Sequence, residues 1–357
     1  MVACFWPFEF HPTNKVEWLT GENGVRFYGL GTIVGEESFP PLSELSPDRS
    51  LIIEIIVRPN RLTDRHAPHI LSLCPDKGPP SLVIGAWKDS LIMRLGRPDA
   101  PGPRKYRELG VRSAFSVGKT TRITVATGSR GTAIYLNGIL QSETLGAGLP
   151  DNKVPLGRLL LGVSMTGGSD WQGNILGLTV YNCVVTEKEI ERDFAAGYIR
   201  DSSGSVPRNT IVARYDFAES SGDKVRNTVG AKYDLTIPRV FEPLRHTILA
   251  TASGSTRFSI SKLQDIFLNI FGFIPFGYVA MLSFRGFTSL RQLSTLVVLA
   301  GFSLSLGTEL VQIFLPTRSS SLIDLATNTL GSAFGVLFFT IVAGCRRKTI
   351  DVKDSRS

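Results

Sequence analysis

The stretch IFLNIFGFIPFGYVAMLSF, residues 266–284, contains 19 residues and no charged side chain. Two more apolar stretches follow it. Residues 293–315 are 23 residues with one charge, and residues 325–344 are 20 residues with none. A helix of about 20 residues crosses a bilayer core of about 30 Å. The sequence therefore predicts three transmembrane helices at the carboxyl end. A buried hairpin of a soluble protein is the alternative, which three consecutive full-length stretches disfavour.

The composition of the whole chain averages over this uneven distribution. The 357 residues are 43% hydrophobic and 20% charged, with four cysteines and a net charge of +8. This hydrophobicity excludes a wholly disordered chain, and so few cysteines exclude a disulfide scaffold. Residues 257–357 contain 10 Lys and Arg against 5 Asp and Glu, so +5 of the +8 lies beside the predicted spans. We therefore expect a lipid bilayer, and no nucleic acid, as the partner of the basic residues.

The basic residues also predict an orientation. Arg285 and Arg291 lie between the first two spans, and Arg346, Arg347 and Lys348 follow the third. Loops rich in Lys and Arg stay in the cytoplasm. Two spans separate these groups, so topology places both on one side, as the rule requires. Everything before residue 266 is then expected outside the cytoplasm.

The amino-terminal part predicts an all-β antiparallel jelly-roll sandwich. Short β-branched runs alternate with Gly, Pro and Asp clusters, and Asn137-Gly138 between apolar runs is a strong hairpin signal. Thr186 is expected to cap a helix over residues 187–196. Strands are expected at Ser50–Pro59 and at residues 82–86, 91–95, 121–127, 133–136, 139–140, 159–163 and 175–181.

Three segments of this part resemble the laminin-G-like domains with the concanavalin A-like fold. They are Ile134-Tyr135-Leu136-Asn137-Gly138, Trp171-Gln172-Gly173-Asn174-Ile175 and Val180-Tyr181-Asn182. The resemblance implies a module that binds glycans or proteins on a concave face or a loop rim, with a plain spacer as the alternative. No calcium loop, metal motif, cofactor motif or paired glycosidase carboxylates accompany it, so we expect neither a metal nor a cofactor.

The expected organisation has five parts. They are an amino-terminal remnant (1–20), the sandwich (21–237), a linker (238–263), the membrane domain (264–345) and a basic cytoplasmic tail (346–357). Residues 211–217 and 233–237 are expected to complete the sandwich or to form a stalk. The sequence does not decide whether Cys74 and Cys183 form a disulfide.

Seven polar side chains are expected near the outer ends of the spans, where burial in lipid is costly unless the groups are paired or functional. The alternatives are an internal network that holds the helices together, for example Glu309 with Arg318, and a functional polar pocket. The candidate residues are Asp265, Asn269, Glu309, Gln312, Arg318, Asp324 and Asn328.

The same residues resemble the VanZ-like membrane family. The matching blocks are Asp265-x3-Asn269-x5-Pro275-Phe276-Gly277, Ser305-x3-Glu309-x2-Gln312-x3-Pro316-x-Arg318 and Asp324-x3-Asn328-x2-Gly331-x3-Gly335. The founding member is associated with low-level resistance to the glycopeptide teicoplanin, which implies the bacterial cell envelope and the inner membrane. Family members generally have a further span before these blocks. This favours a truncated amino terminus for this chain over the alternative, in which the first of the three spans acts as a reverse signal anchor.

Three hypotheses follow. The first is an envelope protein whose external lectin-like domain recognises glycan or a surface protein. The second is an intramembrane enzyme or transporter that acts on a lipid-linked envelope precursor through Glu309, Arg318 and Asp324. The third is a purely structural anchor. The sequence contains no familiar nucleophile or nucleotide-binding motif, which favours a non-enzymatic protein.

Overall fold

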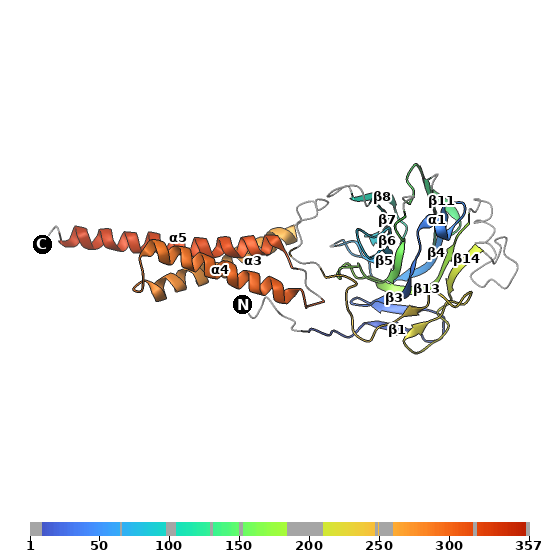
Figure 1. The fold of residues 1–357 in the computed structure, drawn as a ribbon, viewed down its shortest axis with the longest axis horizontal. Helices are drawn as coiled ribbons and strands as arrows, with labels where there is room; N and C mark the ends of the chain where they lie inside the picture. The colour runs from blue at the N-terminus through green and yellow to red at the C-terminus, as the bar shows by residue number, and fades with distance from the viewer. Residues whose placement is uncertain are drawn as a thin grey trace. The chain divides into compact units, whose positions relative to one another are not determined.

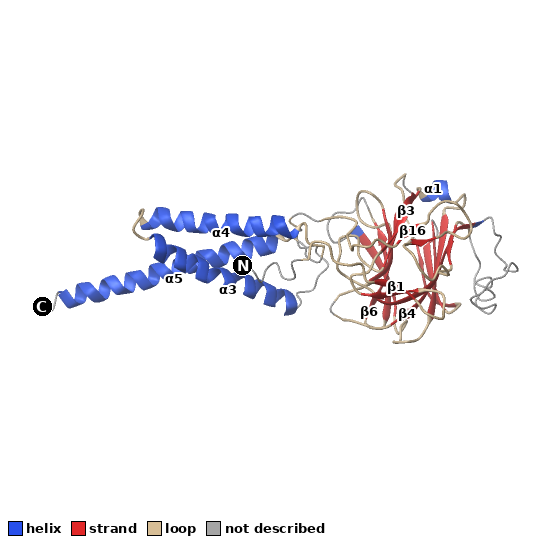
Figure 2. Cartoon of the chain, turned by 90° about the horizontal axis from the view of Figure 1, so that it is seen from below, coloured by secondary structure: helices blue, strands red, loops and turns tan. Residues whose placement is uncertain are grey.

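The computed structural model describes residues 9–64, 66–97, 105–128, 131–149, 153–183, 210–246, 249, 260–316 and 320–354. The chain divides into two compact units, His11–Arg245 and a second that combines Met1–Phe10 with His246–Ser357. The strands belong to the first unit and the three long helices to the second (Figures 1 and 2). This confirms the expected fold class, an antiparallel β-sandwich followed by three apolar helices. The helix expected over 187–196 lies outside the described residues.

The first sheet is antiparallel throughout. Two strands share one edge of β13 (Gln172–Tyr181): β2 pairs with its first half, and β14 (Ile211–Tyr215) pairs with its second half. The other strands follow in the order β1 (Val16–Trp18), β2 (Val25–Tyr28), β13, β4 (Ser50–Pro59), β9 (Thr121–Gly128), β10 (Gly131–Leu136) and β11 (Ile139–Leu145).

The second sheet is also antiparallel. The short helix α1 (Leu42–Leu45) follows its strand β3. In sheet order the strands are β15 (Lys224–Val225), β16 (Leu235–Thr236), β3 (Ile33–Phe39), β12 (Gly157–Leu161), β5 (His69–Cys74), β6 (Leu82–Trp87), β7 (Ser90–Gly96) and β8 (Tyr106–Val111).

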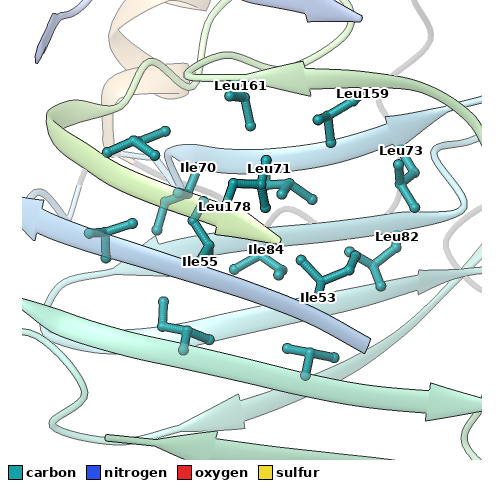
Figure 3. Packing of buried hydrophobic residues seen from close by; sticks show 14 of the residues in the cluster. Ile53, Ile55, Ile70, Leu71, Leu73, Leu82, Ile84, Leu159, Leu161 and Leu178 are labelled. Atoms are coloured by element: carbon teal, nitrogen blue, oxygen red, sulfur yellow. The ribbon is translucent and has the colours of Figure 1, made fainter. Parts of the chain in front are cut away.

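One hydrophobic core fills the space between the two sheets. β4 contributes Ile53 and Ile55 from the first sheet, and these side chains meet Leu71 and Ile84 from the second (Figure 3). All four side chains are fully buried. Alternate residues of a strand point to opposite faces, so each strand supplies one such row to the core. The shared core makes the two sheets a single sandwich.

The last strands and the residues after them complete the sandwich rather than form a stalk. β16 pairs with β3, and residues 238–245, expected as part of a linker, cross the outer face of the second sheet. There Phe241 is fully buried in a small cluster with Cys74, Leu160 and Val163. The first unit is therefore wider at both ends than the expected 21–237.

Cys74 and Cys183 of the sandwich form no disulfide with each other, which answers the question that the sequence left undecided. Cys74 lies in β5 under residues 238–245, whereas Cys183 follows β13 of the other sheet. Burial raises the pKa of the Cys74 thiol to about 12, so this group stays protonated and unreactive at neutral pH.

The second unit contains α3 (Ile260–Phe284), α4 (Leu290–Gln312) and α5 (Leu322–Asp354). Within them, Leu263–Phe284, Leu290–Gln312 and Leu322–Ala343 are long and apolar enough to cross a membrane. Their exposed side chains are mostly large and hydrophobic, as expected for a surface that faces lipid. These three segments agree with the three predicted spans.

Small residues allow α3 and α5 to approach closely. A Cβ atom added to Gly331 would overlap the carbonyl oxygen of Ile270, and one added to Gly335 would overlap that of Ile274. Gly277 of α3 likewise faces the carbonyl oxygen of Ser332. The Gly331-x3-Gly335 spacing therefore packs two helix backbones together.

Candidate functional sites

The polar residues of the bundle gather where α4 ends and α5 begins. Glu309, near the end of α4, is 1% exposed. Its Oε2 accepts a hydrogen bond of 2.7 Å from the backbone N–H of Ser321, and the Ser320 hydroxyl also bonds to its carboxyl group. Ser321 in turn caps α5 with its hydroxyl, which accepts from the N–H of Asp324. Glu309 therefore holds the turn that starts α5.

Near this carboxyl group, the side-chain amides of two asparagines link α5 to the other two helices. Asn269 of α3 donates to Oδ1 of Asp324 on α5 over 2.9 Å. One turn further along α5, Asn328 donates to the hydroxyl of Ser305 on α4 over 3.0 Å, and both residues are buried. Side chains from all three helices thus meet in one polar layer.

The remaining sequence candidates take a smaller part in this layer. Asp265 is exposed at the start of α3, close enough to Asp324 for their charges to repel each other. Gln312 is half-buried at the end of α4. Arg318 lies outside the described residues, so its expected pairing with Glu309 stays a prediction. Ser320 and Ser321 were missed by sequence reasoning, because one bonds through its backbone and neither stands out by charge.

The opposite half of the bundle is apolar. Met281 of α3, Leu293 and Val297 of α4, and Val336 and Phe339 of α5 form its buried cluster. Among the described residues, the bundle's buried charged side chain is Glu309, at the other end. In the described part of the bundle, Glu309 and the Asn269–Asp324 and Asn328–Ser305 hydrogen bonds therefore lie toward the end where α4 meets α5.

A second candidate site lies on the outward face of the first sheet, and sequence reasoning did not identify it. A hollow of about 710 Å³ crosses β4, β9, β13 and β14, and we call it the ion-pair hollow. Its described lining comprises Glu22, Asn23, Glu54, Ile56, Arg58, Thr120, Arg122, Leu176, Gly177, Leu178, Thr179, Tyr181, Arg214, Asp216 and Ala218.

Ion pairs form the walls of the ion-pair hollow. Arg58 binds Glu22 through both of its terminal nitrogens, at 2.6 and 2.9 Å. This hydrogen bond lowers the pKa of Glu22 below its ordinary value, so the pair is charged at neutral pH. Arg214 binds Asp216 at 2.9 Å in the same hollow. The arginines can donate hydrogen bonds to a polar ligand, and the carboxylates can accept hydrogen bonds from it.

The centre of the hollow combines a carboxylate with an apolar floor. Glu54 points outward from the middle of β4, with Nε of Arg122 3.9 Å away and the Thr124 hydroxyl 3.4 Å away. Ile56 and Tyr181 lie on the same face and are only 8% exposed each. An apolar floor with a few placed polar groups is the usual composition of a small-molecule site.

A smaller hollow of about 330 Å³ lies on the same sheet face, and we call it the acidic hollow. It lies over β4, β9, β10 and β11. Its described charged residues are Asp48 and Glu143, and its floor includes Ile52 and Tyr135. Within the described residues, no group of three or more His, Cys, Asp or Glu side chains could hold a metal ion.

The comparisons with known proteins found one family model and a set of solved structures. The VanZ/LLP1 family model matches residues 216–343, a range that covers the three apolar helices and begins in the last part of the sandwich. None of the curated proteins compared matches the chain.

Solved structures are similar to the chain at low identity. The receptor binding domain of a botulinum neurotoxin C/D mosaic serotype is 15% identical, with a TM-score of 0.42, over 52% of this chain and 45% of that one. A heptameric SAP-like pentraxin from Limulus polyphemus is 12% identical, with a TM-score of 0.39, over 64% and 93%. A Trypanosoma rangeli sialidase is 15% identical, with a TM-score of 0.39, over 51% and 28%. The chain thus spans less than half of the neurotoxin domain. The carboxyl-terminal part of the chain, with its three apolar helices, is therefore similar to the VanZ/LLP1 family.

Proposed function

We propose that the chain is a multi-pass protein of the bacterial cytoplasmic membrane whose β-sandwich recognises glycan of the cell envelope. The observation that carries this proposal is the ion-pair hollow. It is large enough for a sugar ring, has an apolar floor, and is lined by three arginines and three carboxylates.

The chemistry of the ion-pair hollow suits a sugar. A sugar ring has apolar C–H faces and many hydroxyl groups, each of which can donate and accept a hydrogen bond. Tyr181 and Ile56 offer the apolar contact, while Arg58 donates and Glu54 accepts. Among the described lining residues the charges balance to zero, from Arg58, Arg122 and Arg214 against Glu22, Glu54 and Asp216. This balance disfavours nucleic acid and other polyanions.

The proposed orientation places the sandwich outside the cytoplasm. Arg285 and Arg291 lie at the junction of α3 and α4, at the end of the bundle away from Glu309. The positive-inside tendency keeps that junction in the cytoplasm. The polar layer around Glu309 then faces the outer leaflet, where envelope glycans and their lipid-linked precursors occur.

The test is glycan binding by the full chain in lipid nanodiscs. We expect binding to at least one envelope polysaccharide or oligosaccharide on a broad glycan panel, and about a tenfold loss with Arg58→Gln. Arg94→Gln is the matched control, because Arg94 forms an ion pair of similar length and exposure with Glu108 on the second sheet. Absence of binding to every glycan, or equal losses in both variants, would refute the proposal.

The polar layer of the bundle carries a second candidate function. Asp324 is only half-buried and has Asn269 as its described side-chain donor, so its carboxyl group could contact a lipid headgroup. An intramembrane enzyme or transporter for lipid-linked precursors would use Asp324 with Glu309 and Arg318. Turnover of a polyprenyl-phosphate sugar by the purified chain, lost in Asp324→Asn, would support this function. The absence of turnover would leave the layer with the structural role that its hydrogen bonds favour.

A further inference from the structure

Two arginines flank the turn between α3 and α4, at the edge of the apolar segments. The first segment ends at Phe284, directly before Arg285, and the second begins at Leu290, directly before Arg291. Both arginine side chains are exposed. In a bilayer this position is the level of the lipid headgroups, because the apolar segments fill the hydrocarbon core. The turn therefore places two guanidinium groups among the headgroups.

The end of α5 adds basic residues near the same level. Ala343, where the third apolar segment ends, packs against the buried cluster with Met281 of α3 and Leu293 of α4. Figures 1 and 2 show α5 continuing past the α3–α4 turn. Three consecutive basic residues precede Asp351 in this continuation, namely Arg346, Arg347 and Lys348. At about 1.5 Å per residue, the five basic residues lie within about two helical turns of one level.

The carboxylates of α3 and α4 are far from this turn. No acidic residue occurs between Asp265 of α3 and Glu309 of α4. Asp265 precedes Arg285 by 20 residues and Glu309 follows Arg291 by 18 residues, which is roughly 27–30 Å along each helix. Neither helix can therefore neutralise the two arginines with a carboxylate of its own. An anionic lipid headgroup has the complementary charge.

Hydrogen bonds hold the turn in one shape. The Ser289 hydroxyl accepts from the backbone N–H of Gln292 and so caps α4. The hydroxyls of Thr288 and Ser289 both donate to Oε1 of Gln292, over 2.7 and 2.9 Å. The N–H of Phe287 donates to the Phe284 carbonyl over 3.1 Å. The backbone that carries the two arginines is therefore ordered before a ligand arrives, which lowers the cost of binding.

Two exposed aromatic side chains lie in the same turn. Phe287 is 82% exposed and Phe284 is 52% exposed, and their ring centroids are 6.0 Å apart. Exposed phenyl rings are unfavourable in water but suit the boundary between headgroups and acyl chains. A soluble phosphate would leave both rings in water, whereas a phospholipid covers them. The combination of rings and positive charge therefore favours a lipid as the occupant.

We propose that the α3–α4 turn is a binding site for the headgroup of an anionic phospholipid. Arg285 and Arg291 bind the phosphate, while Phe284 and Phe287 contact the upper part of the acyl chains. The basic triplet of α5 adds positive potential at the same end. This role goes beyond the effect of basic residues on orientation, and it is independent of the glycan site on the sandwich.

The experiment measures lipid binding to the full chain in detergent micelles by native mass spectrometry. The probes are phosphatidylglycerol and phosphatidylcholine with identical acyl chains. We expect phosphatidylglycerol to bind more tightly, and Arg285→Gln or Arg291→Gln to weaken its binding about fivefold each without affecting phosphatidylcholine. The double variant Phe284→Ala with Phe287→Ala should weaken phosphatidylglycerol binding as well.

Control variants separate this site from a general effect of charge. Arg112→Gln removes an exposed arginine of the sandwich and should leave both affinities unchanged. Arg285→Lys and Arg291→Lys keep the charge and should retain most of the binding, which keeps the test valid if a glutamine variant fails to fold.

Four results would overturn the proposal. The first is equal binding of the two lipids. The second is a loss in Arg112→Gln as large as that in Arg285→Gln. The third is unchanged affinity after removal of both phenyl rings. The fourth is displacement of bound phosphatidylglycerol by glycerol phosphate, which would show that the phosphate alone is recognised. None of these results bears on glycan binding by the sandwich.

Discussion

Truncation of Glu309 should destabilise the membrane bundle, although this residue is also the most conspicuous catalytic candidate. In Glu309→Ala the backbone N–H of Ser321 loses its acceptor, which lies 2.7 Å away, in a place sealed from water. An unsatisfied buried donor costs about 1–3 kcal/mol. The lost γ-methylene adds about 1 kcal/mol in packing. We therefore expect a loss of about 2–4 kcal/mol in the free energy of unfolding.

A conservative variant separates the hydrogen bond from the charge. Glu309→Gln keeps a carbonyl oxygen that can accept from Ser321, so we expect its stability to stay within about 1 kcal/mol of the unchanged protein. Thr308→Ala is the control, because Thr308 is a buried neighbour whose hydroxyl bonds within α4 to the Leu304 carbonyl. It should cost at most about 1 kcal/mol.

The assay is equilibrium unfolding of the full chain in mixed micelles with an increasing fraction of SDS, followed by the helical signal in far-UV circular dichroism. If Glu309→Ala and Thr308→Ala unfold at the same fraction of SDS, the carboxyl group does not hold the α4–α5 turn. If Glu309→Gln is as damaging as Glu309→Ala, the negative charge rather than the acceptor is what matters. Either result would overturn the structural role assigned to this residue.

Three further predictions concern helix packing, pH and the boundary of the sandwich. Gly335→Val should separate α3 from α5, because the new side chain would overlap the Ile274 carbonyl; we expect a lower thermal midpoint in detergent than in the unchanged protein, and an unaltered midpoint would contradict the close packing. Burial lowers the pKa of His69 from 6.5 to about 4, so protons bind the unfolded chain first as the pH falls. The free energy of unfolding should therefore be highest above pH 6.5 and fall by roughly 2–3 kcal/mol as the pH drops to about 4. Unfolding of His69→Gln, followed by tryptophan fluorescence, should lack this pH dependence. Phe241→Ala should cost the sandwich about 3–5 kcal/mol in urea unfolding, against less than about 1 kcal/mol for the exposed Val229→Ala; equal effects would place Phe241 outside the sandwich.

The sequence predicted strands well where apolar residues dominate. β4 has the predicted bounds, Ser50–Pro59, because β-branched residues fill it almost without interruption. β3 and β8 were missed, since three of the seven residues of β3 and three of the six residues of β8 are polar or glycine residues that the sheet leaves exposed. β5 was missed as well: a bulge between His69 and Leu71 breaks its alternation.

The candidate sites were predictable to different degrees. The Asp-x3-Asn spacings indicated polar groups on one helix face, but Asn269 bonds to Asp324 across helices rather than to Asp265 of its own turn. No single-helix pattern contains that pairing. The ion-pair hollow was hidden for another reason. Ile52 and Ile56 make β4 look buried on both faces, and only the folded sheet shows that its outward face is hollowed.

The sandwich begins and finishes at one spot. Thr13 bridges to Val240, the N–H of Phe241 donates to the Pro12 carbonyl over 2.8 Å, and the Asn14 amide binds the Pro238 carbonyl over 2.7 Å. The two ends of the unit His11–Arg245 are therefore bonded to each other and lie side by side. Chain ends that lie close together are the arrangement in which insertion of a whole domain into another protein is tolerated. The sandwich can accordingly diverge in sequence independently of the three apolar helices.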